Sequence, residues 1–225
     1  MDDIYERLDG SLQRMRGAPA ARLRALRREY SRRLAGAKAS TVVRLALRLV
    51  AAGGIARRVV ACELVHCHRA ALASLRAPSL ERLGRGLDGW GAVDVFACYL
   101  AGPAWRERQV GDAVIRRWAR SRDRWWRRAA LVSTVPLNSR ARGGSGDTPR
   151  TLAVCRLLVG DRDDMVVKAM SWALRELAKR DPAAARRFLA EQGDALAAQV
   201  VREVRNKLAT GLKNPRRRGA QGPRR

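Results

Sequence analysis

The stretch Asp163-Asp-Met-Val-Val-Lys-Ala-Met-Ser-Trp-Ala-Leu-Arg-Glu-Leu-Ala-Lys179 decides the fold. Asp163 is a residue type that favours the start of a helix. At about 100° per residue, the helix face within about 60° of Met170 collects four more apolar residues, Val166, Val167, Leu174 and Leu177. The opposite face collects Trp172 and three cations, Lys168, Arg175 and Lys179. The stretch therefore predicts an amphipathic helix whose second face is basic, aromatic and exposed.

Apolar residues recur at the same helical spacing along the whole chain, and no segment alternates as a half-buried strand would. Helix starts are predicted at Pro78-Ser79, Asp123 and Asp181-Pro182. The polar, glycine-rich segment Asn138–Arg150 is predicted to be a connector. The chain is therefore predicted to be all-α, with about a dozen helices in roughly six antiparallel pairs.

A weak internal repeat indicates how these pairs are arranged. Asp88-Gly-Trp90, Asp123-Arg-Trp125 and Asp163-Asp-Met165 are each predicted to open a helix, at a spacing of about 40 residues that is typical of HEAT or armadillo units. Such units stack into an α-solenoid with a concave face, here expected to be a basic groove. Residues 1–210 are predicted to form this single domain, and the basic segment 211–225 a disordered tail.

The charge balance favours a nucleic-acid partner. Lys and Arg total 47 against 21 Asp and Glu, which gives a net charge of +26, and arginine dominates. A GC-rich genome would explain arginine over lysine but not the surplus of positive charge. Arginine suits phosphates, and a ring exposed among cations offers an apolar plane to a sugar or base.

Location and cofactors follow from what the sequence lacks. The acidic start Met1-Asp-Asp-Ile-Tyr-Glu is not that of a signal peptide, and no apolar run approaches the roughly 18 residues that span a membrane. A cytoplasmic protein with reduced cysteines is therefore expected. Cys62 and His66 could share a helix face and hold a metal, but no second ligand pair exists, so packed helix residues are favoured. No metal and no cofactor are predicted.

The segment Asp88-Gly-Trp-Gly-Ala-Val-Asp94 places a ring and a carboxylate one helical turn apart. Val93, Phe96 and Leu100 mark the core side of this helix, with Trp90 and Asp94 on the other side. Two interpretations of Asp94 stay open. It either forms an ion pair with one of the many arginines, or acts on a cationic group of a bound nucleic acid.

The most basic stretch, Arg116–Arg128, is predicted to be a third helix of this kind. Its inner side is ambiguous, because Trp125 and Trp126 each begin an apolar stripe. Arg128 can face the groove beside Trp125. Most of the other arginines are expected to contact phosphates.

Motifs of other enzymes are missing, including G-x-S-x-G, H-E-x-x-H, Walker A and the deaminase H-x-E with P-C-x-x-C. Any reaction must therefore rely on carboxylate, aromatic and arginine side chains. Cleavage of an N-glycosidic bond fits these groups, because a carboxylate stabilises an oxocarbenium-like sugar.

Three stretches, taken together, resemble a known family: Trp90-Gly-Ala-Val-Asp94, Trp125-Trp-Arg-Arg128-Ala-Ala and Lys168-Ala-Met-Ser-Trp172-Ala-Leu-Arg-Glu. They are similar to the DNA alkylation repair family of HEAT-like glycosylases, the AlkD-like proteins, from about Tyr30 to Leu208. The resemblance implies that Asp94 is the catalytic carboxylate and that Trp90 and Trp172 pack against the deoxyribose of the lesion. It also implies that Arg128 contacts the backbone near the lesion and that Tyr30 is an aromatic contact on an early helix.

The resemblance further implies a metal-independent glycosylase, active as a monomer, that releases N3- and N7-alkylated purines from duplex DNA. The aromatic-rich loop usual in the family is missing after Tyr30, which puts that contact in doubt. A non-catalytic HEAT scaffold for DNA or structured RNA and a protein-binding solenoid stay open as alternatives. The DNA-binding surface is predicted to include Tyr30, Arg124, Trp125, Lys168, Arg175, Lys179, Arg202 and Lys207.

Overall fold

The helix predicted from Asp163 forms in the computed structural model, which describes residues 2–15 and 17–215. It is α13 (Asp164–Leu177), and the carboxylate of Asp163 caps it by accepting a hydrogen bond from the backbone N–H of Met165 at 2.9 Å. The predicted apolar face is buried, with Met170 at its centre. This helix confirms the periodicity from which the sequence was interpreted.

Every secondary-structure element in the described residues is helical, which confirms the all-α prediction. The elements are α1 (Asp2–Arg14), α2 (Ala20–Arg33), α3 (Ala39–Ala51), α4 (Ile55–Cys67), α5 (Arg69–Ala73), α6 (Ala77–Leu83), α7 (Trp90–Phe96), the π-helix η1 (Ala97–Ala101), α8 (Gly102–Arg106), α9 (Asp112–Ala119), α10 (Arg124–Val132), α11 (Val135–Asn138), the 3₁₀ turn η2 (Arg140–Arg142), α12 (Thr148–Leu157), α13, α14 (Pro182–Gln192) and α15 (Ala198–Thr210).

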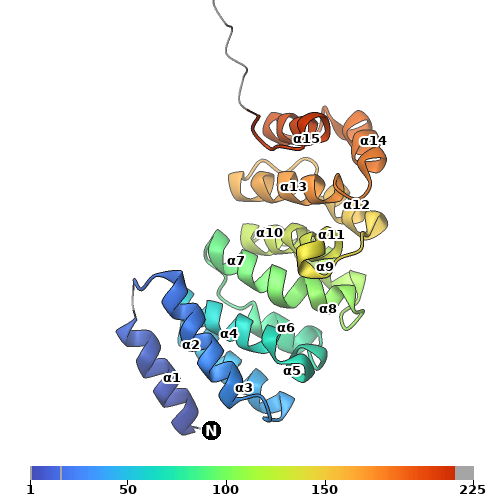
Figure 1. Ribbon diagram of the computed structural model, residues 1–225. Coiled ribbons are helices and arrows are strands. Elements are labelled where there is room, and N and C mark those ends of the chain that lie inside the picture. The colour runs from blue at the N-terminus through green and yellow to red at the C-terminus, as the bar shows by residue number, and fades with distance from the viewer. Residues whose placement is uncertain (1, 16, 216–225) are drawn as a thin grey trace, which may run out of the picture.

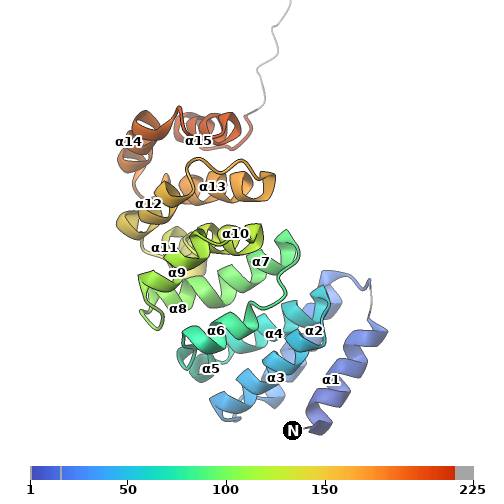
Figure 2. The same cartoon turned by 180° about the vertical axis from the view of Figure 1, so that it is seen from behind.

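The helices stack in two layers, as the opposite views in Figures 1 and 2 show. One layer runs α2, α4, α7, α10, α13 and α15, and each of these helices contacts the next. The other layer includes α3, α9, α12 and α14, each of which pairs with a helix of the first layer. A single apolar core runs between the layers through the stack. The arrangement is consistent with the solenoid expected from the repeat.

The helix starts are confirmed where a side chain caps them. Asp123 accepts a hydrogen bond from the N–H of Trp125 at 2.8 Å, and Asp181 accepts one from the N–H of Ala184 at 2.8 Å. Helix α6 carries Pro78 in its first turn. The segment Asp88-Gly-Trp90 opens α7 as predicted, but the helix starts at Trp90 and the side chain of Asp88 does not cap it. A glycine in extended conformation makes this start instead.

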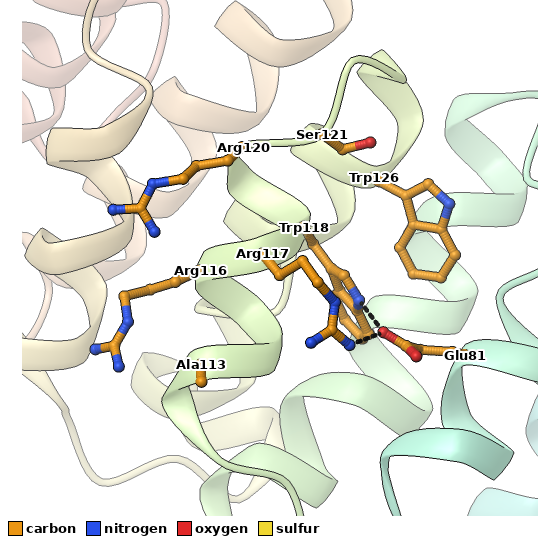
Figure 3. Close-up of a pocket in the computed structure, with 8 residues that line it drawn as sticks. All are labelled: Glu81, Ala113, Arg116, Arg117, Trp118, Arg120, Ser121 and Trp126. Carbon is orange, nitrogen blue, oxygen red and sulfur yellow. Dashed lines mark hydrogen bonds and ion pairs between the residues drawn. The ribbon is translucent and has the colours of Figure 1, made fainter.

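The prediction of a single helix over Arg116–Arg128 was wrong, since α9 ends at Ala119 and α10 starts at Arg124 with Asp123 as its cap. The break settles which tryptophan points inward. The ring of Trp126 lies 4.8 Å from that of Trp118 and 6.0 Å from that of Phe96, centroid to centroid. Figure 3 shows Trp118 and Trp126 of this cluster beside Glu81, which accepts a hydrogen bond from Trp118 Nε1 at 2.9 Å. Trp125 takes no part in this cluster, although it too is partly buried against the core.

Helices α7, η1 and α8 follow one another without a gap and form one continuous helix. Its middle turn, η1, is a π-turn, in which the N–H of Gly102 donates to the carbonyl of Ala97. Pro103 explains the interruption, because it has no N–H for the carbonyl of Tyr99 and its ring would clash with it. His66 occupies that carbonyl instead, with its Nδ1 2.9 Å from the oxygen. A carbonyl only accepts, so Nδ1 carries the proton.

The predicted connector Asn138–Arg150 is shorter and more ordered than expected. Asn138 ends α11, and α12 already starts at Thr148, capped by Asp147. Between them, the guanidinium of Arg180 donates to the carbonyls of Asn138 at 2.7 Å and Gly144 at 3.0 Å. These bonds hold the turn in one conformation, although its glycine-rich sequence is typical of a loose loop.

The chain after α15 is described as far as residue 215. Here Lys213 lies 3.4 Å from Glu203 as an ion pair, so the start of the predicted tail is attached to α15. The rest of that tail, 216–225, lies outside the described residues. In the described part, no helix is both long enough and apolar enough to span a membrane.

Candidate functional site

An ion pair between Asp94 and Arg128 is the centre of the candidate site. Arg128 Nε lies 3.0 Å from Asp94 Oδ1, and Arg128 Nη2 lies 3.0 Å from Asp94 Oδ2. Arg128 Nη1 donates to the carbonyl of Met165 at 2.6 Å. One guanidinium thus joins α7, α10 and the start of α13. Of the two interpretations of Asp94, the ion pair is present.

The pair leaves the carboxylate partly accessible. The side chain of Asp94 is 20% exposed, whereas that of Arg128 is only 7% exposed. Each carboxylate oxygen accepts one bond from Arg128 and keeps a second lone pair. Asp94 can therefore accept a further hydrogen bond from a water or ligand without losing its arginine.

Burial raises the pKa of Asp94, and the hydrogen bonds and charge of Arg128, together with the charge of Arg142, pull it back down. Burial is the largest of these effects. The carboxylate is thus held in a poorly hydrated place, where its charge acts more strongly on a neighbour than it would in water.

Two of the predicted rings differ in how far they are presented. Trp90 is the first residue of α7, one turn before Asp94, and 63% of its surface is exposed. Trp172 is half-buried and packs against the core, so its ring is less exposed than the sequence predicted. Only Trp90 offers a large open face beside the carboxylate.

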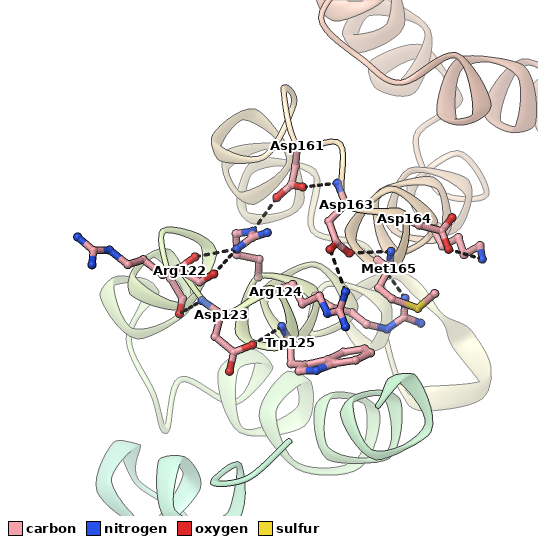
Figure 4. Close-up of polar contacts among 12 residues, drawn as sticks. Arg122, Asp123, Arg124, Trp125, Asp161, Asp163, Asp164 and Met165 are labelled. Carbon is pink, nitrogen blue, oxygen red and sulfur yellow. Dashed lines mark hydrogen bonds and ion pairs between the residues drawn. The ribbon is translucent and has the colours of Figure 1, made fainter. Parts of the chain in front are cut away.

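Trp125 and Arg124 lie together at the start of α10. The guanidinium carbon of Arg124 is 4.9 Å from the centroid of the Trp125 ring, a cation–π contact. Figure 4 shows the two acids beside them. Arg124 Nη1 lies 3.4 Å from Asp163 Oδ2, and the backbone N–H of Trp125 donates to the carboxylate of Asp123. The exposed Arg124 can exchange its weak surface partner for a phosphate.

The predicted lysines of α13 are exposed, and each has an acid beside it. Lys168 Nζ lies 2.7 Å from Asp164, and Lys179 Nζ lies 2.6 Å from Glu176. Arg175 is turned inward, since its Nε donates to Ser171 Oγ at 3.2 Å and burial lowers its pKa. Lys168 and Lys179 are therefore better placed than Arg175 to meet a polyanion.

Helix α15 carries the last two predicted DNA contacts. Arg202 is exposed and lines a shallow cavity between α14 and α15. Lys207 is half-buried and donates to the carbonyl of Gly211 at the end of the helix. Both are surface cations at the end of the stack, away from the ion pair on α7 and α10.

Comparison with known proteins bears directly on this site. The sequence matches the family described as DNA alkylation repair enzyme over residues 9–208. The chain belongs to that family. No curated protein and no solved structure was found to match it. All three stretches that carry the resemblance, on α7, α10 and α13, lie inside the matched residues, and the suspected family is confirmed.

Membership of the DNA alkylation repair enzymes makes this a protein that acts on damaged DNA, and the structure bears on two of the predicted contacts. Tyr30 is 3% exposed, buried on α2 with the guanidinium of Arg33 5.0 Å from its ring centroid. The structure therefore does not bring its ring to the surface. Arg128 is directed at Asp94 and a carbonyl, so it positions the carboxylate, and its contact with the DNA backbone stays a prediction.

Sequence reasoning missed one neighbour of Trp90 in this DNA alkylation repair enzyme. The exposed Ile55 follows the turn Gly53-Gly54, whose residues both have positive φ. Its Cδ1 lies 3.9 Å from where a Cβ on Gly91 would be. The sequence signal that could have indicated Ile55 was its position directly after the turn glycines Gly53 and Gly54, where an apolar side chain is exposed. Ile55 and Trp90 are thus two exposed apolar side chains near the start of α7.

Other cavities and clusters do not compete with Asp94. The cavity of about 640 Å³ in Figure 3 is lined by Glu81 and the arginines of α9, but Arg116 and Arg120 point away from Glu81. No group of three or more metal-ligating side chains occurs in the described residues. Cys62 is buried, and burial raises the pKa of its thiol to about 12.

Proposed function

We propose that this DNA alkylation repair enzyme is a DNA glycosylase that hydrolyses the N-glycosidic bond of cationic N3- and N7-alkylated purines in duplex DNA. One observation carries the proposal: Asp94 is fixed by Arg128 yet remains 20% exposed, one turn from the open ring of Trp90. A carboxylate that served only the fold would not need an exposed indole beside it.

The chemistry needs little more than this carboxylate. In a cationic alkylpurine, the electrons of the C1′–N bond move to the base, which leaves neutral, while the sugar takes up the positive charge. Water then adds to C1′ and loses a proton, giving an abasic site. Asp94 stabilises the positive sugar and accepts a hydrogen bond from the attacking water, and its fixed position removes the need to reorganise during the reaction.

The surrounding fold supplies the DNA surface. We infer that the two layers are HEAT-like pairs and that the faces of α7, α10 and α13 next to Asp94 form the groove. Trp90, with the accessible part of Trp172, packs against the deoxyribose. Arg124, Lys168 and Lys179 attract the backbone through charge, and the stacked ring of Trp125 supports them. A monomer is sufficient, because one chain supplies all of these groups.

A non-catalytic scaffold that binds DNA is the second candidate. It is favoured by the fact that both oxygens of Asp94 already accept a hydrogen bond from Arg128. The two candidates share the basic surface and differ only in whether a base is released. Chromatography of bases freed from N-methylated duplex DNA therefore separates them. We expect 7-methylguanine or 3-methyladenine in the supernatant. If the protein binds the DNA firmly but releases no base, the non-catalytic scaffold is the correct interpretation.

The partner itself is tested by salt. If about six phosphates are neutralised, the logarithm of the duplex association constant should fall against the logarithm of salt concentration with a slope of about −5. Fluorescence anisotropy with a labelled duplex measures this slope. A flat response would instead indicate a protein partner, the third interpretation of the solenoid.

A further inference from the structure

Arg142, on the 3₁₀ turn η2, faces the candidate site from a segment that the sequence marked as a mere connector. Its guanidinium carbon lies 5.7 Å from the centroid of the Tyr99 ring, and the side chain is half-buried. Its charge acts on two groups of the continuous helix α7–η1, Asp94 and Cys98, and on His66 of α4. The side chain therefore packs against Tyr99 of that helix, and its positive charge acts on the Asp94 carboxylate.

The fold fixes Arg142 by its backbone. Arg106 Nη1 donates to the carbonyl of Arg142 at 2.7 Å, and the N–H of Arg142 donates to the carbonyl of Ser139 at 3.0 Å. Gly143 then turns the chain with φ of 80°. These contacts set the direction of the side chain but use none of its guanidinium donors.

The π-turn completes the geometry on the helix side. Tyr99 lies in η1, which follows directly on the helix α7 that carries Asp94. The ring that Arg142 packs against and the carboxylate thus belong to one continuous helix. Between them lies Cys98, whose thiol is neutral because burial raises its pKa to about 12. No negative charge on that thiol competes for Arg142.

The guanidinium of Arg142 has unused hydrogen-bond donors, whereas that of Arg128 donates to Asp94 and to the carbonyl of Met165. Within residues 2–15 and 17–215, no carboxylate or carbonyl accepts a hydrogen bond from it. Its five N–H donors, arranged in a planar fork, match the oxygens of a phosphate. A half-buried arginine whose guanidinium donates to no carboxylate or carbonyl of the described residues is suited to bind a phosphate of DNA.

We propose that Arg142 binds the DNA phosphate next to the nucleotide whose sugar faces Asp94, the role that the resemblance gave to Arg128. The proposal rests on the proposed function for the place of that nucleotide, but not for the phosphate contact itself. Arg142 is a binding and positioning residue, whereas Asp94 acts on the reacting sugar.

Binding of a duplex with a stable abasic analogue tests the contact, because it needs no turnover. Arg142→Ala should weaken binding about equally for all sequences and make the salt slope less steep by about 1. Arg140→Ala is the matched control, since Arg140 is exposed on the same turn, and it should leave the slope unchanged. Arg142→Lys should recover the slope but only part of the affinity, because a lysine keeps the charge without the fork.

The pH dependence of base release tests where the phosphate lies. The charged and titratable groups around Asp94 are Arg128 from α10, Arg142 from η2 and Cys98 from its own helix, with Glu176 of α13 close to Cys98. Arg142 lowers the pKa of Asp94, and activity needs the ionised carboxylate. In Arg142→Ala, the acid limb of the single-turnover rate should therefore move to higher pH, and in Arg140→Ala it should not.

The outcomes separate the proposals. A wild-type salt slope in Arg142→Ala, or an equal change in Arg140→Ala, overturns the phosphate contact. An unmoved acid limb overturns its place beside Asp94. Wild-type protein that binds the duplex but releases no base overturns the proposed glycosylase, while the salt slopes still decide on Arg142. An unchanged melting temperature of Arg142→Ala confirms that the variant is folded.

Discussion

Replacing Asp94 with asparagine is expected to slow base release by about 100- to 1,000-fold, the effect of removing one preorganised electrostatic group from an active site. The amide keeps the size of the carboxylate and can still accept one bond from Arg128, so the fold and the DNA surface should persist. Only the negative charge facing the sugar is lost. Single-turnover release from methylated duplex, with enzyme in excess, measures the chemical step.

The control for this variant is Asp88→Asn. Asp88 is an exposed carboxylate just before α7, so its removal changes the net charge equally without touching the ion pair. We expect wild-type rates from it. Equal rates for Asp94→Asn and the wild type would remove Asp94 from the mechanism, whatever the DNA affinity.

Replacing Arg128 with methionine is expected to destabilise the protein by about 3 kcal/mol, because a mostly buried carboxylate loses its cation. Asp94 would lose two hydrogen bonds and the carbonyl of Met165 a third. For a chain of this size, the loss corresponds to a melting temperature lower by roughly 6–12 °C. Thermal unfolding followed by circular dichroism measures it.

Two further variants identify the cause. Asp94→Leu combined with Arg128→Met removes both charges and should recover most of the lost stability, yet remain inactive. Arg124→Met, on the same helix, breaks an exposed ion pair of 3.4 Å and the cation–π contact with Trp125, and should cost about 1 kcal/mol. If the double variant is as unstable as Arg128→Met, the unpaired carboxylate is not the source of the loss.

The sequence predicted well whatever depends on neighbours along one helix. The apolar face around Met170 is buried, and the acids Asp123, Asp163 and Asp181 cap their helices as expected. Helical spacing also placed Trp90 away from the core side of α7. Such features follow from the 3.6-residue repeat and from local side-chain-to-backbone bonds.

Features that need three helices at once could not be predicted in this way. The partner of Asp94 lies 34 residues away on α10, and the third bond of Arg128 reaches α13. The burial of Tyr30 depends on how the first helices pack together, which no local pattern records. Arg142 was missed because a glycine-rich loop carries no periodicity, while Arg106 and Arg180 that order it are remote in sequence.

The claim at the centre of this account is that Asp94 stabilises positive charge on the sugar, and one binding comparison measures it. Two duplexes would carry abasic analogues of the same shape, one a cationic pyrrolidine and the other a neutral tetrahydrofuran. The wild type should bind the cationic duplex about 100-fold more tightly, as expected of a transition-state mimic, and Asp94→Asn should lose that preference. Equal wild-type affinity for the two duplexes would contradict the account.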